Sequence, residues 1–272
     1  MQTRSNIGVS LKRKRKKSFI KKTCAYFIFV LFFISLAILG LTNKHVRIKN
    51  IIIDGNTSVK SFDVLKIAND ELYKNYLWII PTDNILLLRS GEIENQILNN
   101  IKKAKDVSVS VSGIDEIKIS IKERVDDSLW CKDNILNIDN CYSMDSEGFI
   151  FEKISDVSQN IKPIYSGLIK DENPIGQFYF KDNFNKISSL YKGFQDISFS
   201  PQYFEAINEN EYKVGILGGG YILLNNKKSF ESSLTNLQAL VANKYIGSDE
   251  DSIKKIKYID LRFGNKVNFE LN

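Results

Sequence analysis

TCAYFIFVLFFISLAILGLTN fills positions Thr23–Asn43, and none of its 21 residues carries a charge. Lysine residues flank the segment on both sides. A helix of this length would extend about 32 Å at ~1.5 Å per residue, which is enough to cross the hydrocarbon core of a bilayer. We therefore expect a single membrane-spanning helix at 23–43, with a short tail at 1–22 before it and folded domains after it.

The charge of the chain is divided between its two ends. Residues 1–50 contain twelve Lys and Arg and no Asp or Glu, and nine of these basic residues precede the apolar segment. Because the whole chain has 38 basic and 32 acidic residues, positions 51–272 carry 26 and 32 of them and are acidic overall. The positive-inside rule then predicts a cytoplasmic tail and C-terminal domains on the extracytoplasmic face.

Two other interpretations of the N-terminus compete with a membrane anchor. A cleaved signal peptide would have a shorter apolar region and a small-residue cleavage site, and Ala37 and Gly40 do not form that pattern. The basic run Lys12–Lys17 is by itself typical of a nucleic-acid or nuclear-localisation patch. Directly before an apolar span, it favours a role in topology and contact with the lipid bilayer, so we expect no nucleic acid partner.

Positions 46–124 have the pattern of one small α+β unit. A β-branched strand, VRIKNIII, opens the unit, and apolar residues then follow helical spacing after Ser61 and again after Ser90. Val107–Val111 and Ile117–Ile121 alternate apolar with polar residues, which is typical of strands with one exposed face. The order strand, helix, helix, strand, strand predicts a sheet covered by helices on one side.

Positions 125–272 are richer in strand patterns. Ser128–Lys132 and Cys141–Lys153 resemble paired strands, the second broken by a turn at Asp145–Gly148, and Phe204–Asn226 resembles a three-stranded meander. Apolar stripes predict helices at 183–191 and at 230–245. We expect a mostly antiparallel β domain with flanking helices.

The last segment, KKIKYIDLRFGNKVNFEL, predicts a β-hairpin at 254–271. Gly264-Asn265 fits a two-residue turn with glycine first. In such a hairpin Ile259, Leu261 and Phe263 would share one face of their strand.

Cys131 and Cys141 fall in two neighbouring strand candidates, ten positions apart. On the exported side of a membrane a disulfide between them is chemically permitted. The alternative is a pair of buried thiols. We expect a cross-strand disulfide.

Motifs for catalysis or cofactors are weak throughout the sequence. Gly218–Gly220 lacks the Lys and Ser or Thr of a phosphate-binding loop, and Asp249–Asp251 lacks the ligand spacing of a calcium loop. The single histidine, His45, lies beside the membrane segment, which argues against a triad with a His base. A carboxylate dyad stays open, although no pattern points to one. The sequence predicts no cofactor and no metal site.

In this order the pieces resemble a bacterial cell-division family, FtsQ, also called DivIB. The resemblance covers nearly the whole chain, from the basic tail and single span to the C-terminal hairpin. Its most specific residues are, in chain order, Glu123-Arg124, Trp130, Asp145 with Gly148-Phe149, and Tyr258–Phe263. It implies a POTRA domain at 46–124 and the family's β domain at 125–272. The cysteine pair departs from the family pattern.

The resemblance implies a scaffold without enzymatic activity, located at the division septum. Such a scaffold recruits FtsB/FtsL-type bitopic proteins, among other membrane proteins of the divisome, and links them to septal peptidoglycan synthesis. A partner strand would pair with the C-terminal edge of the β domain. Carried over by motif, the partner-binding candidates are Arg262, Phe263, Val267, Asn268 and Phe269. Two structural alternatives stand beside this assignment, because Arg262 can pair with Asp260 and Phe263 can belong to the core.

Two functions of other classes also fit parts of the pattern. POTRA units occur in polypeptide transport and assembly proteins, but 125–272 lacks the evenly spaced lipid-facing strands of the barrel found there. An exported, anchored cell-wall enzyme is the other alternative. A lack of activity of 46–272 on peptidoglycan would exclude it.

Overall fold

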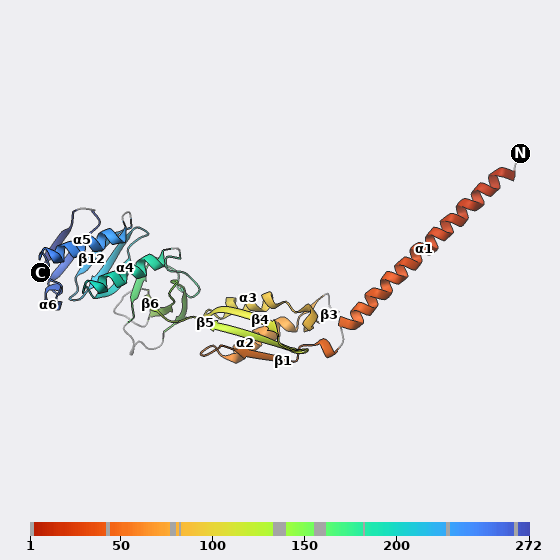
Figure 1. Cartoon of the computed structure of the whole chain (residues 1–272), viewed down its shortest axis with the longest axis horizontal. Helices are drawn as coiled ribbons and strands as arrows, with labels where there is room; N and C mark the ends of the chain where they lie inside the picture. The colour runs from red at the N-terminus through yellow and green to blue at the C-terminus, as the bar shows by residue number, and fades with distance from the viewer. Residues whose placement is uncertain are drawn as a thin grey trace. The chain divides into compact units, whose positions relative to one another are not determined.

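The computed structural model describes most of the chain, and every structural statement below refers to these residues. They are 3–41, 44–76, 80–81, 83–132, 140–154, 162–181, 183–226, 229–263 and 266–272. The chain divides into two compact units, 1–122 and 123–272, which are described one at a time (Figure 1). The domain boundary predicted from the sequence, after residue 124, lies two residues beyond the observed one.

The N-terminal helix α1 (Thr3–Leu41) includes the basic tail as well as the apolar segment. Its section Lys21–Leu41 has a mean hydropathy of 2.6, and none of this section is buried in the protein. Within the described residues this is the one helix long and apolar enough to cross a membrane. A single N-terminal apolar helix, as the sequence predicted, is therefore present.

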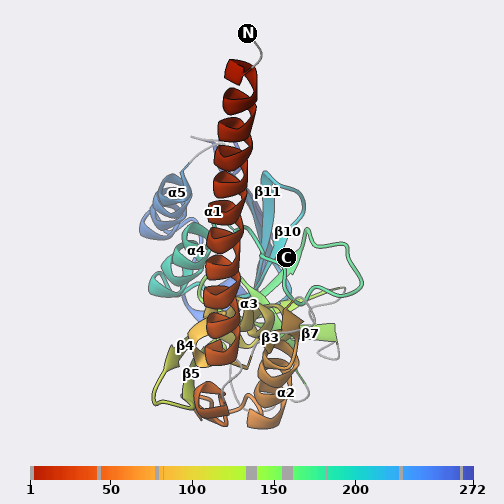
Figure 2. The ribbon, with the colours of Figure 1, turned by 90° about the vertical axis from the view of Figure 1, so that its right-hand side faces the viewer.

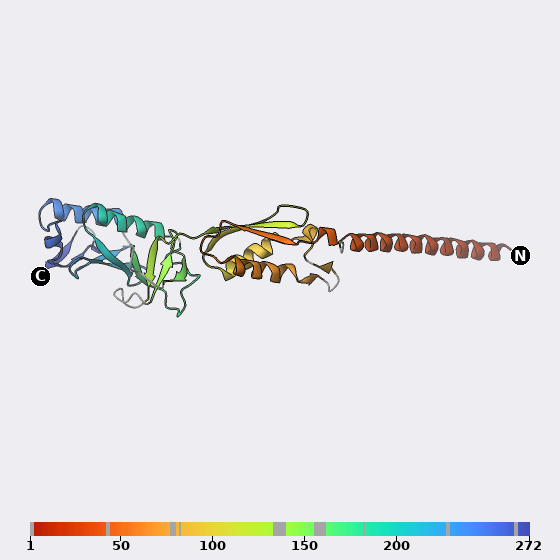
Figure 3. The ribbon, with the colours of Figure 1, turned by 90° about the horizontal axis from the view of Figure 1, so that it is seen from below.

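The rest of the first unit is a three-stranded sheet with two helices. Its elements are β1 (Asn50–Asp54), α2 (Ser61–Leu72), β2 (Asn75–Tyr76), β3 (Ile80–Pro81), α3 (Ser90–Asn100), β4 (Ala104–Val111) and β5 (Glu116–Glu123), with short 3-10 turns at Lys44–Val46 and Ile85–Leu87. The strand order is β1-β5-β4, with β1 parallel to β5. Figure 3 shows α2 and α3 on one face of this sheet.

The alternation in the sequence sets which side chains of this sheet are buried. Ile117, Ile119 and Ile121 of β5 are buried, and they pack with Val64 of α2 and Ile97 of α3 in one apolar core. Because successive side chains of a strand point to opposite faces, the polar residues between them stay on the open face. The predicted order of strands and helices is confirmed, with the small β2-β3 ribbon as an addition.

The second unit holds a nine-stranded sheet among its described residues, in the order β14-β13-β12-β11-β10-β9-β6-β7-β8. The strands are β6 (Ser128–Cys131), β7 (Cys141–Met144), β8 (Ile150–Lys153), β9 (Ile164–Gly167), β10 (Pro201–Ala206), β11 (Glu211–Ile216), β12 (Tyr221–Asn225), β13 (Ile256–Asp260) and β14 (Asn268–Leu271). The helices are α4 (Phe184–Asp196), α5 (Phe230–Ala242) and the short α6 (Glu250–Ile253). Figures 1 and 2 show α4 and α5 beside each other on one face of the sheet.

The sheet is mixed, where the sequence predicted a mostly antiparallel one. β9 is parallel to both β6 and β10, and β12 is parallel to β13, while the other neighbours are antiparallel. The reason is that α4 connects β9 to β10 and α5 connects β12 to β13. A helix that crosses over one face returns the chain in the same direction, so the strands it joins are parallel. The two helices were expected at nearly these positions, but their role as crossovers was not.

The core of the second unit lies between the sheet and these two helices. Trp130, Tyr165 and Phe204 are fully or almost fully buried there. Leu237 of α5 is buried as expected. The helix ends at Ala242, however, and Tyr245, which the predicted apolar stripe included, is exposed. The Lys244 backbone has a φ of 59°, which turns the chain away from the helix before Tyr245.

Gly148 closes the turn between β7 and β8, and we expect its replacement by alanine to destabilise this unit. Its φ is +81°, and an added Cβ would lie 2.5 Å from the Tyr179 carbonyl oxygen and 2.8 Å from the Phe184 ring. Backbone strain and overpacking together should lower the free energy of unfolding by about 1–3 kcal/mol. Denaturant unfolding measures the change. Gly219→Ala is the control, because Gly219 has a similar φ but nothing within 4 Å of the added atom.

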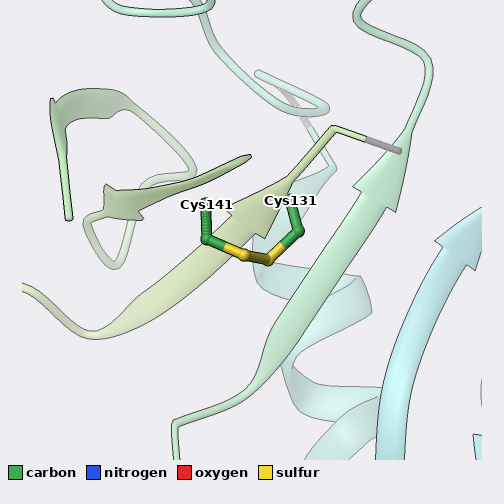
Figure 4. Close-up of a disulfide and its surroundings, with 2 residues drawn as sticks. All are labelled: Cys131 and Cys141. Atoms are coloured by element: carbon green, nitrogen blue, oxygen red, sulfur yellow. A yellow bond between two sulfur atoms is a disulfide. The ribbon is translucent and has the colours of Figure 1, made fainter. Parts of the chain in front are cut away.

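A disulfide joins Cys131 and Cys141 across β6 and β7 (Figure 4). The two residues are direct partners in the antiparallel ladder, and their Cα atoms are 4.1 Å apart. Both side chains are buried. The bond therefore closes the loop between β6 and β7, in which 133–139 lie outside the described residues.

Removing this disulfide with Cys131→Ser and Cys141→Ser should lower the free energy of unfolding by about 2–3 kcal/mol, because the cross-link restricts the unfolded chain. Urea unfolding of the full chain in detergent, with and without a reductant, measures the effect. The reductant should shift the unmodified protein and leave the double variant unchanged. A shift of both proteins would contradict the assignment.

Candidate functional site

β14 is the outermost strand at one edge of the large sheet. It pairs with β13 in antiparallel register from Ile256–Leu271 to Asp260–Asn268. The C-terminal hairpin predicted from the sequence is thus present. The proposed turn residues Gly264-Asn265 lie outside the described residues, but the ladder ends at Asp260, earlier than a two-residue turn there would allow.

The hydrogen bonds of β13 show which N–H and C=O groups of β14 point outward, away from the sheet. Leu261 donates its N–H to the Leu223 carbonyl of β12 over 2.9 Å, so the backbone groups of Asp260, one residue earlier, point to the other side, toward β14. Asp260 is opposite Asn268. Asn268 and Glu270 therefore bond to β13, and the N–H and C=O groups of Phe269 and Leu271 point away from the sheet.

At the opposite edge of the sheet, the start of β8 is covered. Ile150 donates its N–H to the Gln177 carbonyl over 2.9 Å and accepts from Gly176 over 2.7 Å. Phe149 and Phe178 form a further bridge. A segment after β9 thus pairs with the start of β8, while for the outer groups of β14 no described segment plays this part. The two edges differ, and β14 is the one open to strand addition.

Arg262 lies at the end of β13 in a network of carboxylates. Its Nη2 is 2.7 Å from Asp260 Oδ2, its Nε donates to Asp260 Oδ1 over 2.9 Å, and its Nη1 is 3.3 Å from Glu211 Oε1. The Arg262 backbone N–H also donates to Asp260 Oδ1 over 3.0 Å, which turns the chain and ends the strand. The pairing of Arg262 with Asp260, considered from the sequence, is therefore present.

The electrostatics of Asp260 follow from this pairing. Burial by itself would raise the pKa of Asp260, but the hydrogen bonds and charge of Arg262 outweigh it, and the pKa lies below its usual value. The carboxylate is thus held ionised at neutral pH. It fixes Arg262 just after the end of β13, where the guanidinium also reaches Glu211 of β11.

The other candidate residues divide between surface and core. Phe263 is 61% exposed, so it does not belong to the core as the alternative suggested. The Arg262 guanidinium lies 5.6 Å from the centre of its ring. Val267 and Phe269 are partly buried and pack against the core, whereas Asn268 is exposed. Val267, Asn268 and Phe269 therefore lie on or next to β14, and Arg262 and Phe263 follow the end of β13. Phe263 and Asn268 are exposed, whereas the Arg262 side chain is 27% exposed and paired with Glu211 of β11.

Sequence reasoning missed an open groove of about 1140 Å³ near the N-terminal ends of α4 and α5. Its walls include Asn183, Lys186, Tyr212, Phe230 and Leu234. These residues come from three segments far apart in sequence, so no local motif could have revealed the groove. Among the described residues, no cluster of His, Cys, Asp and Glu has the form of a metal site.

No protein-family model matches the chain, and a search among curated proteins finds no match.

Proposed function

We propose that this chain is a membrane-anchored, non-enzymatic scaffold of the bacterial divisome, of the FtsQ/DivIB type. Its second unit binds a short single-span partner by adding a strand of that partner to β14. The observation that carries the proposal is the open β14 edge, in a sheet whose opposite edge strand is paired at its start. Strand addition uses main-chain hydrogen bonds for affinity and flanking side chains for selection.

The side chains at this edge suggest what the partner strand looks like. On the helix-covered face, Phe269 is partly buried and Leu271 is 47% exposed, so an added strand would extend the core with apolar residues. On the other face, Glu270 pairs with Lys257 over 2.8 Å, so polar residues fit there. A strand with alternating apolar and polar residues is therefore the expected ligand.

The first unit and the anchor fit the same assignment. The order β1, α2, α3, β4, β5 agrees with a POTRA domain. The basic tail before the apolar section of α1 supports a cytoplasmic N-terminus, which leaves the part of the first unit after α1 and the whole second unit on the extracytoplasmic face, at the septum.

Photo-crosslinking in a dividing bacterium tests the proposal. A photo-reactive amino acid at Asn268 should capture a short, single-span coiled-coil division protein of the FtsB/FtsL type, identified by mass spectrometry. The same amino acid at Lys153, which is exposed on β8 at the opposite edge of the sheet, is the matched control and should not capture that protein. Equal capture at both positions, or capture at neither, would refute the assignment of the β14 edge.

A further inference from the structure

One end of the first unit is tied to the end of α1 by hydrogen bonds. The side-chain amide of Asn84 donates to the carbonyl of Leu41, the last residue of α1, over 2.6 Å. The side-chain oxygen of Asn84 accepts from the N–H of Leu86 over 2.8 Å, and Asn84 also forms a β-bridge with Arg47. Asn84 itself is fully buried. The 3-10 turn Ile85–Leu87 is therefore held close to the point where the apolar helix ends.

The turn between β4 and β5 lies at this same end of the unit. Lys49 donates its backbone N–H to the Asp115 carbonyl over 2.8 Å, and its Nζ is 2.7 Å from Asp115 Oδ2. Asn50, the first residue of β1, pairs with Glu116, the first residue of β5. Because Lys49 follows the 3-10 turn after α1 by only three residues, the turn 112–115 is also on the side of the unit next to α1.

This end, which we call the anchor-side end, exposes large apolar side chains at the tips of its turns. Ile114 is 80% exposed and Leu86 is 69% exposed. Tyr73, which ends α2 just before the β2-β3 ribbon that leads to Asn84, is also 69% exposed. Soluble surfaces do expose single apolar residues, but three at one end, two in turns and one at a helix terminus, are unusual for a small unit.

Basic residues lie at the same end of the unit, and three of them pair with carboxylates there: Arg47 with Asp83, Lys49 with Asp115 and Lys74 with Glu71. The exposed ones at this end are Lys44, Arg47, Lys49, Lys74 and Arg89. Apolar and aromatic side chains next to Lys and Arg are the combination that binds the boundary between lipid headgroups and acyl chains. The long basic side chains reach phosphate oxygens while their stems cover apolar surface.

We propose that the anchor-side end of the first unit is a lipid-binding surface that rests on the bilayer. Leu86, Ile114 and Tyr73 enter the headgroup boundary, and the surrounding Lys and Arg contact lipid phosphates. The proposal rests on the membrane anchoring of α1 proposed above. Its strongest support is the Asn84–Leu41 bond, because a turn bonded to the last residue of a membrane span lies at the depth of the headgroups. Such a contact would restrict rotation of the first unit about its anchor.

Fluorescence quenching in nanodiscs tests this surface with the full chain. Cys131 and Cys141 are joined in the disulfide, so in a Cys24→Ser background an introduced cysteine is the one reactive thiol. This thiol is labelled with an environment-sensitive fluorophore. Labels at Leu86→Cys, Ile114→Cys and Tyr73→Cys should lose about half or more of their emission to lipids with a nitroxide high on the acyl chain, as expected for side chains at this depth. The matched control is Phe62→Cys, because Phe62 is 74% exposed in the first turn of α2, which follows the far end of β1. It should not be quenched.

A label on the native Cys24 separates this proposal from the anchoring on which it rests. If Cys24 is quenched and positions 86 and 114 are not, the anchor stands and the lipid-binding surface is refuted. If Cys24 is not quenched either, anchoring itself fails and the surface fails with it. A double variant perturbs the surface directly. Leu86→Glu together with Ile114→Glu should reduce the quenching of a label at Tyr73→Cys by about half or more, because charged side chains are expelled from the apolar layer. Unchanged quenching there would also overturn the proposal.

Discussion

Replacing Leu271 with proline should weaken binding of the partner strand by about 10- to 100-fold, since one main-chain hydrogen bond is lost and a partner carbonyl is left unpaired. The Leu271 N–H points away from β13, so proline removes a group that only the partner uses. The ladder within the protein keeps its bonds from Asn268 and Glu270. The effect on binding should therefore be far larger than the effect on folding.

The matched control for this variant is Leu271→Ala. Like the proline variant, it loses the leucine side chain, but it keeps the backbone N–H group. Its loss of affinity therefore measures the contribution of the apolar side-chain contact alone. Binding of the captured FtsB/FtsL-type protein to the full chain in detergent, measured by titration, compares the two variants. Equal affinities for the proline and alanine variants would mean that the partner does not add a strand at this edge. Unfolding curves check that both variants stay folded.

The strands and helices of both units could be predicted largely because their patterns are local. The alternation at Ile117, Ile119 and Ile121 follows from the period of a strand, and all three are buried. The parallel pairing of β12 with β13 could not be predicted in the same way. It depends on α5 crossing over the face of the sheet, which is a relation between segments more than thirty residues apart.

At the candidate site the sequence pattern predicted both strands of the hairpin but placed the end of β13 too late. A period of two assigns Phe263 to the same face as Ile259 and Leu261, and a long strand would bury all three. The side chain of Asp260 instead accepts the N–H of Arg262 two residues later, and this turn leaves Phe263 exposed. Such side-chain to backbone bonds compete with a strand ladder, and the spacing of apolar residues carries no sign of them.

Arg124→Ala should lower the free energy of unfolding of the second unit by about 3–5 kcal/mol, the cost of breaking a buried ion pair from one side. Nη1 of Arg124 is paired with Oδ2 of Asp145, whose side chain is only 2% exposed. The other oxygen of Asp145 accepts the N–H groups of Glu147 and Phe149 over 2.9 and 3.0 Å. The guanidinium also lies 3.8 Å from the centre of the Phe149 ring. Without Arg124, the buried Asp145 carboxylate loses its counter-charge, and Phe149 in the turn after β7 loses its contact with the guanidinium.

Denaturant unfolding of the full chain, followed by tryptophan fluorescence, measures this cost, and two further variants locate its origin. Lys257→Ala breaks the pair with Glu270, in which both side chains are about half exposed, and should change stability little because solvent screens such pairs. Asp145→Asn in the Arg124→Ala background removes the uncompensated charge but keeps an oxygen for the two backbone N–H groups. It should therefore restore part of the lost stability. If it lowers stability further, the contact of Arg124 with Phe149, and not its charge, is what holds this turn in place.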